Sequence, residues 1–453
     1  MKMITLLTFA LTSVAANAKI SSQDAAKLSG ELTPMGAIRA ANKDGSIPAW
    51  KGGITTPPAG YKVGMHHPDP FSSDKILYTV TNSNKEQYQD LLTPGVSKML
   101  VTYPDTYKLN VYQSRRTASY PQYVYAATLE NATRAELIQN GSGETSGIKG
   151  AAIGIPFPTP ANGIEAIWNH ILRYRGISTT RNGGQAGPTA SGNYTYIGFD
   201  ESIMFDYSMP NATPEALQES NIIFRFKQKV IKPARLAGTA VLVHESMDQI
   251  KQPRQAWTYN SGQRRVRRAP NLAYDTPGAA SDGLRTTDDF DMYNGAPDRY
   301  TWVLKGKQEV LIPYNSYKLH SDSLQYDDIL KPGHIATDVV RWEKHRVWVV
   351  EAELKDGTRH VYKKRVFYID EDSWQVSISD LYDNRDELYR VAVAYGLNYY
   401  DVPTHWSTLE VYHDLVSRRY IAMGLDNQEK MYDFNSIQKE RMYTPAALKR
   451  GGR

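Results

Sequence analysis

Two short stretches of this sequence bring histidines together with acids or with each other, as metal sites require. His244–Asp248 reads HESMD, which lacks the second histidine of the HExxH zinc-protease helix and follows the strand-like segment AGTAVLV. His66 and His67 precede Pro68 in a loop, and no further ligands stand at a zinc-site spacing. We therefore predict surface histidines at the second stretch and a metal site at neither.

A third stretch, DDFDMYNG at Asp288–Gly295, gathers three acids that could bind calcium. Its glycine is out of step with an EF-hand loop, and no glutamate stands at the closing position. A turn held by Asx hydrogen bonds is the favoured interpretation, and weak calcium binding is the alternative.

Patterns of common catalytic sites are missing from the chain. There is no GxSxG nucleophile elbow and no glycine loop of the phosphate-binding kind. The cysteine count is zero, which excludes thiol nucleophiles and disulfides. Glu351 and Glu353 fall on one face of a predicted strand, whereas a glycosidase pair comes from separate strands. The sequence predicts a binding protein, not an enzyme, with no catalytic residue and no cofactor.

The first eighteen residues, MKMITLLTFALTSVAANA, have the features of a secretory signal. Lys2 gives a positive start, an apolar run follows, and Ala16-Asn17-Ala18 forms a small-x-small cleavage pattern. The run is too short to span a membrane, and no other stretch approaches 18 uninterrupted apolar residues. We expect residues 1–18 to be a signal peptide cut after Ala18, and the mature chain to lie in the periplasm without spanning a membrane.

Charge and aromatic content narrow the class of protein further. The 53 basic and 48 acidic side chains nearly balance, which argues against a nucleic-acid partner. Tyrosine is abundant, with 31 residues against 10 phenylalanines, as is typical of strands and half-wet cavities. A β-rich protein is the simplest explanation.

The chain divides at about residue 193 into two kinds of pattern. Residues 19–193 are irregular, with one clear helix at Gly163–Tyr174 and a glycine-rich stretch at 181–193 that we interpret as a flexible joint. From residue 194 to 453 the hydrophobic pattern has period two, in about ten strands joined by short turns. We predict a mainly β (α+β) fold: one large curved antiparallel sheet with an apolar face and a charged face, on which the irregular segment packs.

Four arginines lie within five residues in WTYNSGQRRVRRAP: Arg264, Arg265, Arg267 and Arg268. The stretch predicts a hairpin about Asn260-Ser261-Gly262, and strand alternation sends the arginines to both faces. A nucleic-acid stripe would keep them on one surface. Solvated charges that protect a sheet edge are the favoured interpretation, and contact with acidic head groups or with a partner is the alternative.

A curved sheet with an aromatic inner face suggests a container for an apolar ligand. The aromatic residues expected to line it are Trp257, Tyr259, Trp302, Tyr314, Tyr317, Trp342, Trp348, Phe367 and Trp374. Ordinary core packing is the alternative for each of them.

Several long motifs carry a resemblance to a known family. They are ELTPMGAIRAANKDGSIPAWKGG, ARLAGTAVLVHESMDQIKQPRQAWTYNSGQRRVRRAP, IPYNSYKL and RWEKHRVWVVEAELKDGTRHVYKKRVFYIDEDSWQV. With these, nearly the whole mature chain resembles the bacterial family of domain of unknown function 1329, often labelled outer membrane lipoprotein-sorting protein. The resemblance implies a fold similar to the LolA/LolB lipoprotein carriers, an incomplete barrel closed by helices around a hydrophobic cavity.

The resemblance also implies a function. Family members are associated with RND/MMPL-type transporters and a companion outer-membrane protein, so we expect a carrier or adaptor for a lipid-like molecule. Residues 194–453 would form the half-barrel, with Gly163–Tyr174 as a lid. The carriers are much shorter than this chain, so residues 19–193 have no counterpart in them. A glycan-binding or envelope-assembly protein is the alternative.

Overall fold

The computed structural model describes residues 20–140, 145–270, 272 and 274–451. The predicted signal peptide and its cleavage site lie outside the described residues. Among those that are described, no helix has both the length and the apolar composition needed to cross a bilayer.

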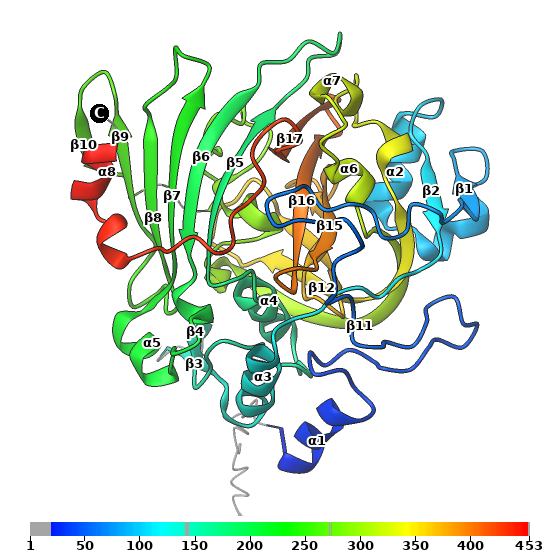
Figure 1. The fold of residues 1–453 in the computed structure, drawn as a ribbon, viewed down its shortest axis with the longest axis horizontal. Helices are drawn as coiled ribbons and strands as arrows, with labels where there is room; N and C mark the ends of the chain where they lie inside the picture. The colour runs from blue at the N-terminus through cyan, green and yellow to red at the C-terminus, as the bar shows by residue number, and fades with distance from the viewer. Residues whose placement is uncertain (1–19, 141–144, 271, 273, 452–453) are drawn as a thin grey trace, which may run out of the picture.

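One 15-stranded sheet dominates the molecule (Figure 1), and a two-stranded sheet, β3–β4, lies apart from it. The strands are β1 (Tyr78–Val80), β2 (Leu109–Tyr112), β3 (Glu136–Gln139), β4 (Thr145–Lys149), β5 (Ser178–Ala186), β6 (Ile197–Met204), β7 (Ile222–Lys232), β8 (Ala240–Ser246), β9 (Gln255–Asn260), β10 (Arg265–Arg268), β11 (Tyr300–Pro313), β12 (Trp342–Leu354), β13 (Lys364–Asp370), β14 (Val376–Tyr382), β15 (Leu388–Tyr399), β16 (Thr404–Asp414) and β17 (Arg419–Leu425). The α-helices are α1 (Ser22–Ala26), α2 (Pro94–Thr102), α3 (Gln122–Arg134), α4 (Gly163–Leu172), α5 (Pro214–Ser220), α6 (Tyr317–His320), α7 (Tyr326–Ile329) and α8 (Pro445–Gly451).

The large sheet is open and almost entirely antiparallel. Its strands follow the order β1-β2-β12-β13-β14-β15-β16-β17-β5-β6-β7-β8-β9-β10, and β11 pairs with β12. The exception is a short parallel contact between β2 and β12. Because β1 and β10 end the path without pairing to each other, the sheet does not close. The predicted fold class, a large curved antiparallel sheet forming an incomplete barrel, is confirmed.

Strands from both sides of residue 193 build this sheet. β1, β2 and β5 precede that residue, and β5 lies in the middle of the sheet between β17 and β6. The glycine-rich stretch expected to be a flexible joint is therefore partly a strand, since β5 includes residues 181–186. Close packing accounts for one of these glycines, Gly184. A Cβ there would lie 2.5 Å from the Ile197 oxygen and from the Tyr196 ring, so only glycine fits.

The expectation of one apolar and one charged face is wrong for much of the sheet. On β12, Val350 and Ala352 pack into a core on the concave side, whereas Val347 and Val349 pack into a second core on the opposite side. Residues of α2 and of the segment 314–340 complete that second core. α2 and the segment 314–340 thus cover a face that a simple antiparallel sheet would leave to solvent.

Helix α4 is a fixed core element, which corrects its expected role as a lid. All of its residues except Ile164 are buried, and it packs on β11 and β12 inside the curve of the sheet. Asn162 caps its start by accepting from the Glu165 N–H at 3.0 Å. A Cβ at Gly163 would lie 2.8 Å from the Val303 nitrogen, so the first turn touches the β11 backbone. Protein thus fills one half of the concavity.

Candidate ligand-binding site

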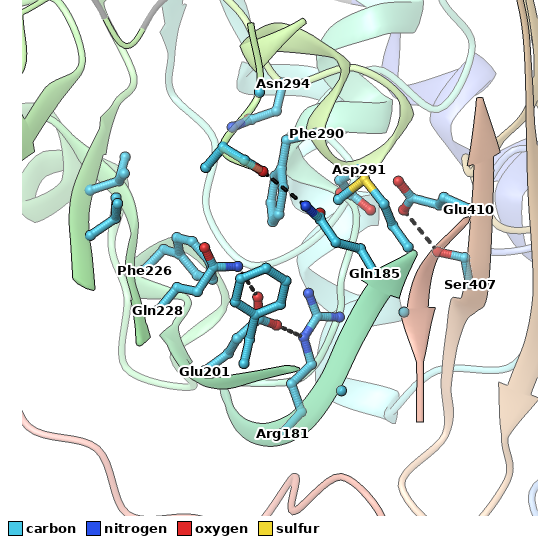
Figure 2. A pocket seen from close by; sticks show the side chains of 18 of the residues that line it. Arg181, Gln185, Glu201, Phe226, Gln228, Phe290, Asp291, Asn294, Ser407 and Glu410 are labelled. Carbon is cyan, nitrogen blue, oxygen red and sulfur yellow. Dashed lines mark hydrogen bonds and ion pairs between the residues drawn. The ribbon is translucent and has the colours of Figure 1, made fainter. Parts of the chain in front are cut away.

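The other half of the concave face contains a cavity, seen from close by in Figure 2. Its volume is 130 Å³. Residues of β5 to β8, β16 and β17 form the wall, and residues of the segment 278–294 lie across it as a roof. The site therefore lies where the open sheet curves but α4 does not reach.

Strand alternation makes much of the wall apolar. Phe224 and Phe226 of β7 line the cavity together with Val241 and Val243 of β8. Arg225, between the two phenylalanines, points to the opposite side and pairs with Asp206 at 3.1 Å. The period-two pattern of this segment thus produces a phenylalanine face toward the cavity and a charged face away from it.

The roof contacts the wall and is anchored to the core. The Phe290 ring lies 5.4 Å from the Phe226 ring between centroids. The next residue, Asp291, is buried and forms ion pairs with Arg173 and Arg175, which follow α4. Both arginines hold the pKa of Asp291 below its usual value, although burial alone raises it. Asp291 therefore anchors the roof on the C-terminal side of Phe290.

Asp288 and Asp289, on the N-terminal side of Phe290, supply the second anchor of the roof. Asp288 accepts hydrogen bonds from Thr286 at 2.6 Å and from Arg365 at 2.7 Å. Asp289 accepts from the Thr286 N–H at 2.7 Å and from the Tyr362 hydroxyl at 2.9 Å. The stretch forms a 3-10 helix with a capping box between Thr286 and Asp289 instead of the expected Asx turn, and donors far along the chain engage its carboxylates. Sequence reasoning found neither the capping box nor these partners.

A buried ion pair adds polarity to the wall. Arg181 of β5 pairs with Glu201 on the neighbouring strand β6, and Gln228 donates to the same carboxylate at 2.6 Å. The Arg181 guanidinium lies 5.0 Å from the Trp406 ring centroid and 5.5 Å from that of Tyr432. A cation held between aromatic rings is thus one of six charged side chains that line the cavity, the others being Glu201, Arg254, Arg285, Asp291 and Glu410.

Glu410 of β16 is the second notable polar group. Ser407 and Tyr412 each donate to its carboxylate at 3.0 Å. Burial raises the pKa of Glu410, and the negative charge of Asp291 raises it further. No histidine is among the residues that line the cavity, so Ser407 has no Ser–His partner here. The arrangement suits binding of a largely apolar molecule with a polar group.

The structure places all nine aromatic residues that were predicted to line a ligand site away from this cavity. Trp257 and Tyr259 of β9 pack with Leu448 of α8 on the opposite face of the sheet. The register explains their direction. Trp257 pairs with Leu242, whereas the neighbouring valines, Val241 and Val243, point into the cavity.

Four more of the nine lie in the half of the concavity that α4 fills. Trp302 stacks on Phe367 with ring centroids 5.9 Å apart, and Trp348 stacks on Trp374 at 6.2 Å. All four belong to, or pack against, the core that includes α4. They do face the concave side, but protein occupies the space in front of them.

The last three lie in the second core or at a second cavity. Tyr314 and Trp342 are buried in the second core, on the side of the sheet opposite the concave face, and Tyr317 lines a cavity of 600 Å³ beside His66 and His67. Of the nine, only Tyr317 lines either of the two cavities. Ligand contact by these residues stays a prediction.

The histidine stretches have structural partners. His67 is buried, contrary to expectation, and bonds to Asp401 at 2.7 Å. His244 lies on strand β8 and bonds to the Tyr443 carbonyl at 2.7 Å, so HESMD is not a zinc helix.

The arginine-rich stretch forms the predicted hairpin at the β10 edge, with Arg265 opposite Asn260. Arg264 lies in the turn with φ 54°, and all four arginines are exposed. Within the described part of the chain, none of them forms an ion pair with another side chain. Val266 between them packs toward α8. Solvated edge charges fit this geometry, and contact with a partner stays a prediction.

Sequence reasoning missed the residues that line the cavity, although a signal for some was present. The alternation Phe224–Arg225–Phe226 was visible, but nothing local shows which part of the concave face stays empty. Arg181 was hidden in the glycine-rich stretch that resembled a joint.

Comparisons with known proteins agree with the resemblance in the motifs. Residues 79–449 match the model of the family described as "Protein of unknown function (DUF1329)". Uncharacterized protein PA3922 of Pseudomonas aeruginosa is 49% identical over 447 residues, which cover 98% of this chain and 97% of that protein.

Solved structures show a more distant likeness. One is described as an outer membrane lipoprotein-sorting protein domain from Vibrio parahaemolyticus, with a TM-score of 0.44, 13% identity and coverage of 64% of this chain and 98% of that one. Another is the LolA superfamily protein NE2245 from Nitrosomonas europaea, with a TM-score of 0.36, 10% identity and coverage of 61% and 93%. The family model spans most of the sequence, and this chain belongs to the DUF1329 family.

Proposed function

We propose that this protein is a non-enzymatic carrier or adaptor that holds a lipid-like hydrophobic molecule in the cavity on the concave face of its sheet. The phenylalanine and valine wall formed by β7 and β8 carries this proposal. Removing apolar surface from water contributes about 25 cal/mol per Å², so an apolar guest is favoured over a polar one.

The size of the cavity limits what it accepts in the conformation described. Pockets for drug-sized ligands span roughly 300–1,000 Å³, whereas this one has 130 Å³. Such a volume admits a short hydrophobe or the end of an acyl chain. Phe290 lies in the roof against Phe226, so movement of this ring is the simplest way to lengthen the site.

Polar groups at the cavity would set the orientation of the guest. Arg181 can donate hydrogen bonds from its guanidinium to a carboxylate or phosphate oxygen, and Glu410 in its protonated form can donate a hydrogen bond. An amphiphile with a single polar group is therefore a better match than a pure hydrocarbon.

Location and partners belong to the same proposal. The signal-like start of the sequence supports export to the periplasm. The family resemblance suggests work with an RND/MMPL-type transporter and an outer-membrane protein. The exposed arginines Arg264, Arg265, Arg267 and Arg268 would meet an anionic head group or the acidic surface of such a partner.

The first test is organic extraction of the purified mature protein, followed by mass spectrometry and by titration with a fluorescent naphthylamine probe. We expect a stoichiometric amphiphile in the extract and probe binding that the amphiphile displaces. Val243→Asp places a charge in the cavity wall and should abolish both, whereas Val416→Asp, at a side chain 77% exposed, should change neither.

An empty extract together with no probe binding, repeated after incubation with envelope lipids, would overturn the proposal. Normal binding by a folded Val243→Asp variant would move the site elsewhere. Tryptophan fluorescence that responds to oligosaccharide but not to detergent would instead favour the glycan-binding alternative.

A further inference from the structure

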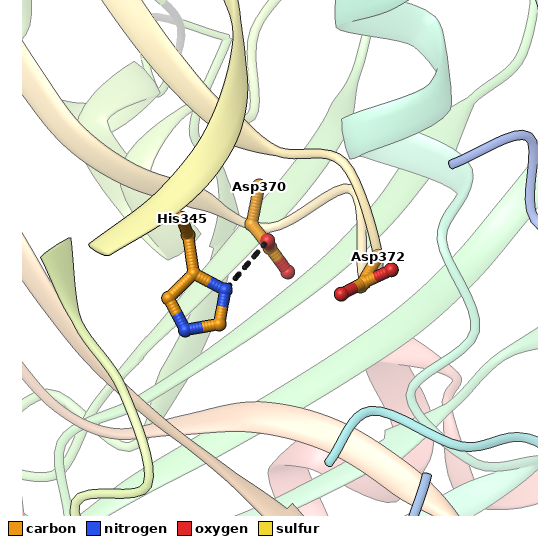
Figure 3. Close-up of side chains that lie close together, drawn as sticks. All are labelled: His345, Asp370 and Asp372. Carbon is orange, nitrogen blue, oxygen red and sulfur yellow. Dashed lines mark ion pairs between the residues drawn. The ribbon is translucent and has the colours of Figure 1, made fainter. Parts of the chain in front are cut away.

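A second cluster of side chains lies outside the cavity, where β12 meets the turn between β13 and β14 (Figure 3). His345 of β12, Asp370 at the end of β13 and Asp372 in the turn each offer one ligand atom, and these atoms lie within 4.8 Å of one another. The three residues are at most 4% exposed. One imidazole nitrogen and two carboxylate oxygens are a ligand set for a divalent transition metal.

The hydrogen bond from Nε2 of His345 leaves its other ring nitrogen, Nδ1, available to a metal ion. Its Nε2 lies 3.0 Å from the carboxylate of Glu343. Glu343 also accepts from the Arg115 N–H at 2.7 Å and the Asn315 amide at 2.9 Å, as an ionised carboxylate does. Because a carboxylate only accepts, Nε2 must carry a proton, and Nδ1 is the ring nitrogen whose lone pair can bind a cation. A carboxylate that accepts a hydrogen bond from the other ring nitrogen is a usual outer-shell partner of a metal-binding histidine.

Asp370 faces that lone pair with an unoccupied oxygen. Its Oδ2 accepts from the Ser373 N–H at 3.0 Å, the Ser373 hydroxyl at 2.6 Å and the Tyr314 hydroxyl at 3.3 Å. Its Oδ1 is buried without a partner among the described residues and lies 3.9 Å from His345 Nδ1. That distance is too long for a hydrogen bond. The imidazole nitrogen and the carboxylate oxygen thus face each other without a hydrogen bond between them, an arrangement that a cation between them would stabilise.

The charges around the cluster leave room for such a cation. Arg116 donates to both oxygens of Asp372, at 2.7 and 2.8 Å, and so balances one of the two aspartates. Arg346 and Lys307 donate to Glu371 at 2.6 and 2.7 Å and are occupied there. No lysine or arginine of the described residues donates to Asp370, whose basic neighbour is His345 at 3.9 Å.

We infer that His345 Nδ1, Asp370 Oδ1 and one oxygen of Asp372 bind a divalent transition-metal ion of the zinc or manganese class. Glu343 orients the histidine, and Arg116 keeps its contact with the other oxygen of Asp372. Because the site is buried, the ion enters during folding and exchanges slowly with chelators in the native state. It joins β12 to the β13–β14 turn and is separate from the cavity proposed to bind a ligand.

The test is refolding of untagged full-length mature protein from guanidinium in chelator-treated buffer, with zinc, with manganese or without metal. After gel filtration, metal is counted by mass spectrometry and the thermal midpoint is measured. We expect one ion per chain, a higher Tm than for the metal-free sample, and retention of the ion when EDTA is added after folding.

Variants locate the ion. Asp370→Asn and His345→Gln should lose it, whereas Asp380→Asn and His413→Gln, equally buried controls on strands β14 and β16, should retain it. Refolding the wild-type chain with cobalt gives a second readout. Nitrogen and oxygen ligands in a buried site should produce a d–d absorption band, and EDTA added after folding should not remove this band.

Equal Tm and no stoichiometric metal in all refolded samples would overturn the inference and show that a proton between His345 and Asp370 suffices. Full metal content in folded Asp370→Asn would overturn it as well. Neither outcome affects ligand extraction from the cavity, so the two proposals fail independently.

Discussion

The backbone N–H of Gly95, in the first turn of α2, donates to the carboxylate of Asp380 on β14 at 3.1 Å. This contact fixes α2 on the outer face of the sheet. It also explains the glycine: a Cβ at residue 95 would lie 2.0 Å from the Asp380 Oδ1 atom and 2.8 Å from the Val391 side chain.

Replacement of Gly95 by alanine should therefore destabilise the protein. Asp380 and Val391 are fully buried and have no space to move into, so overpacking should cost about 1–3 kcal/mol. Urea denaturation measures this cost. Gly187→Ala is the control, because its nearest neighbours lie at an ordinary 3.5 Å. Equal losses in both variants would contradict the explanation.

Asp380 should also make stability depend on pH. Burial raises the pKa of this carboxyl from 3.8 to about 7. A raised folded-state pKa means that the native state binds the proton more tightly, so the contribution is complete below pH 3.8 and is lost as the pH rises to about 7.

Asp380→Asn removes that dependence. Relative to the wild type, the variant should gain stability as the pH rises from about 4 to 7, by roughly 1 kcal/mol per pH unit. Denaturation curves at several pH values test this. Parallel pH profiles for the two proteins would show that Asp380 does not titrate in this window.

Phe290→Ala should enlarge the cavity if the ring occupies the space that a ligand takes. We expect tighter binding of a naphthylamine probe and a loss of stability of about 1–3 kcal/mol, since the ring is half-buried. Phe71→Ala, also half-buried but at the second cavity, should leave probe binding unchanged. Weaker probe binding by Phe290→Ala would mean that the ring contacts the ligand instead of taking its place.

The exposed arginines of the β9–β10 hairpin should matter for association and not for folding. Arg265→Glu combined with Arg267→Glu should change the free energy of unfolding by no more than about 0.5 kcal/mol, because both side chains are exposed. Binding to vesicles that contain anionic lipid should fall and should weaken with added salt in the wild type.

Lys51→Glu combined with Lys62→Glu makes the same charge change at exposed positions in the N-terminal segment. Vesicle sedimentation compares the two double variants. If both lose binding equally, net charge alone is responsible and the hairpin has no special role.

Local patterns in the sequence determined the strands and their hairpins. Alternation along β7 and β12 predicted which side chains share a face, and Asn260-Ser261-Gly262 predicted the β9–β10 turn that the register confirms. These features depend on residues two to five positions apart, which is the range over which strand period and turn chemistry act.

The tertiary structure decided which faces are filled. Residues 151–175, which include α4, occupy part of the concavity, so Trp348 and Trp374 are core residues while Phe224 and Phe226 border a cavity. The same is true of His345 and Asp370, which belong to different strands and meet because β12 and β13 pair. Contacts between residues far apart in the chain depend on how whole elements pack, and no local spacing specifies that packing.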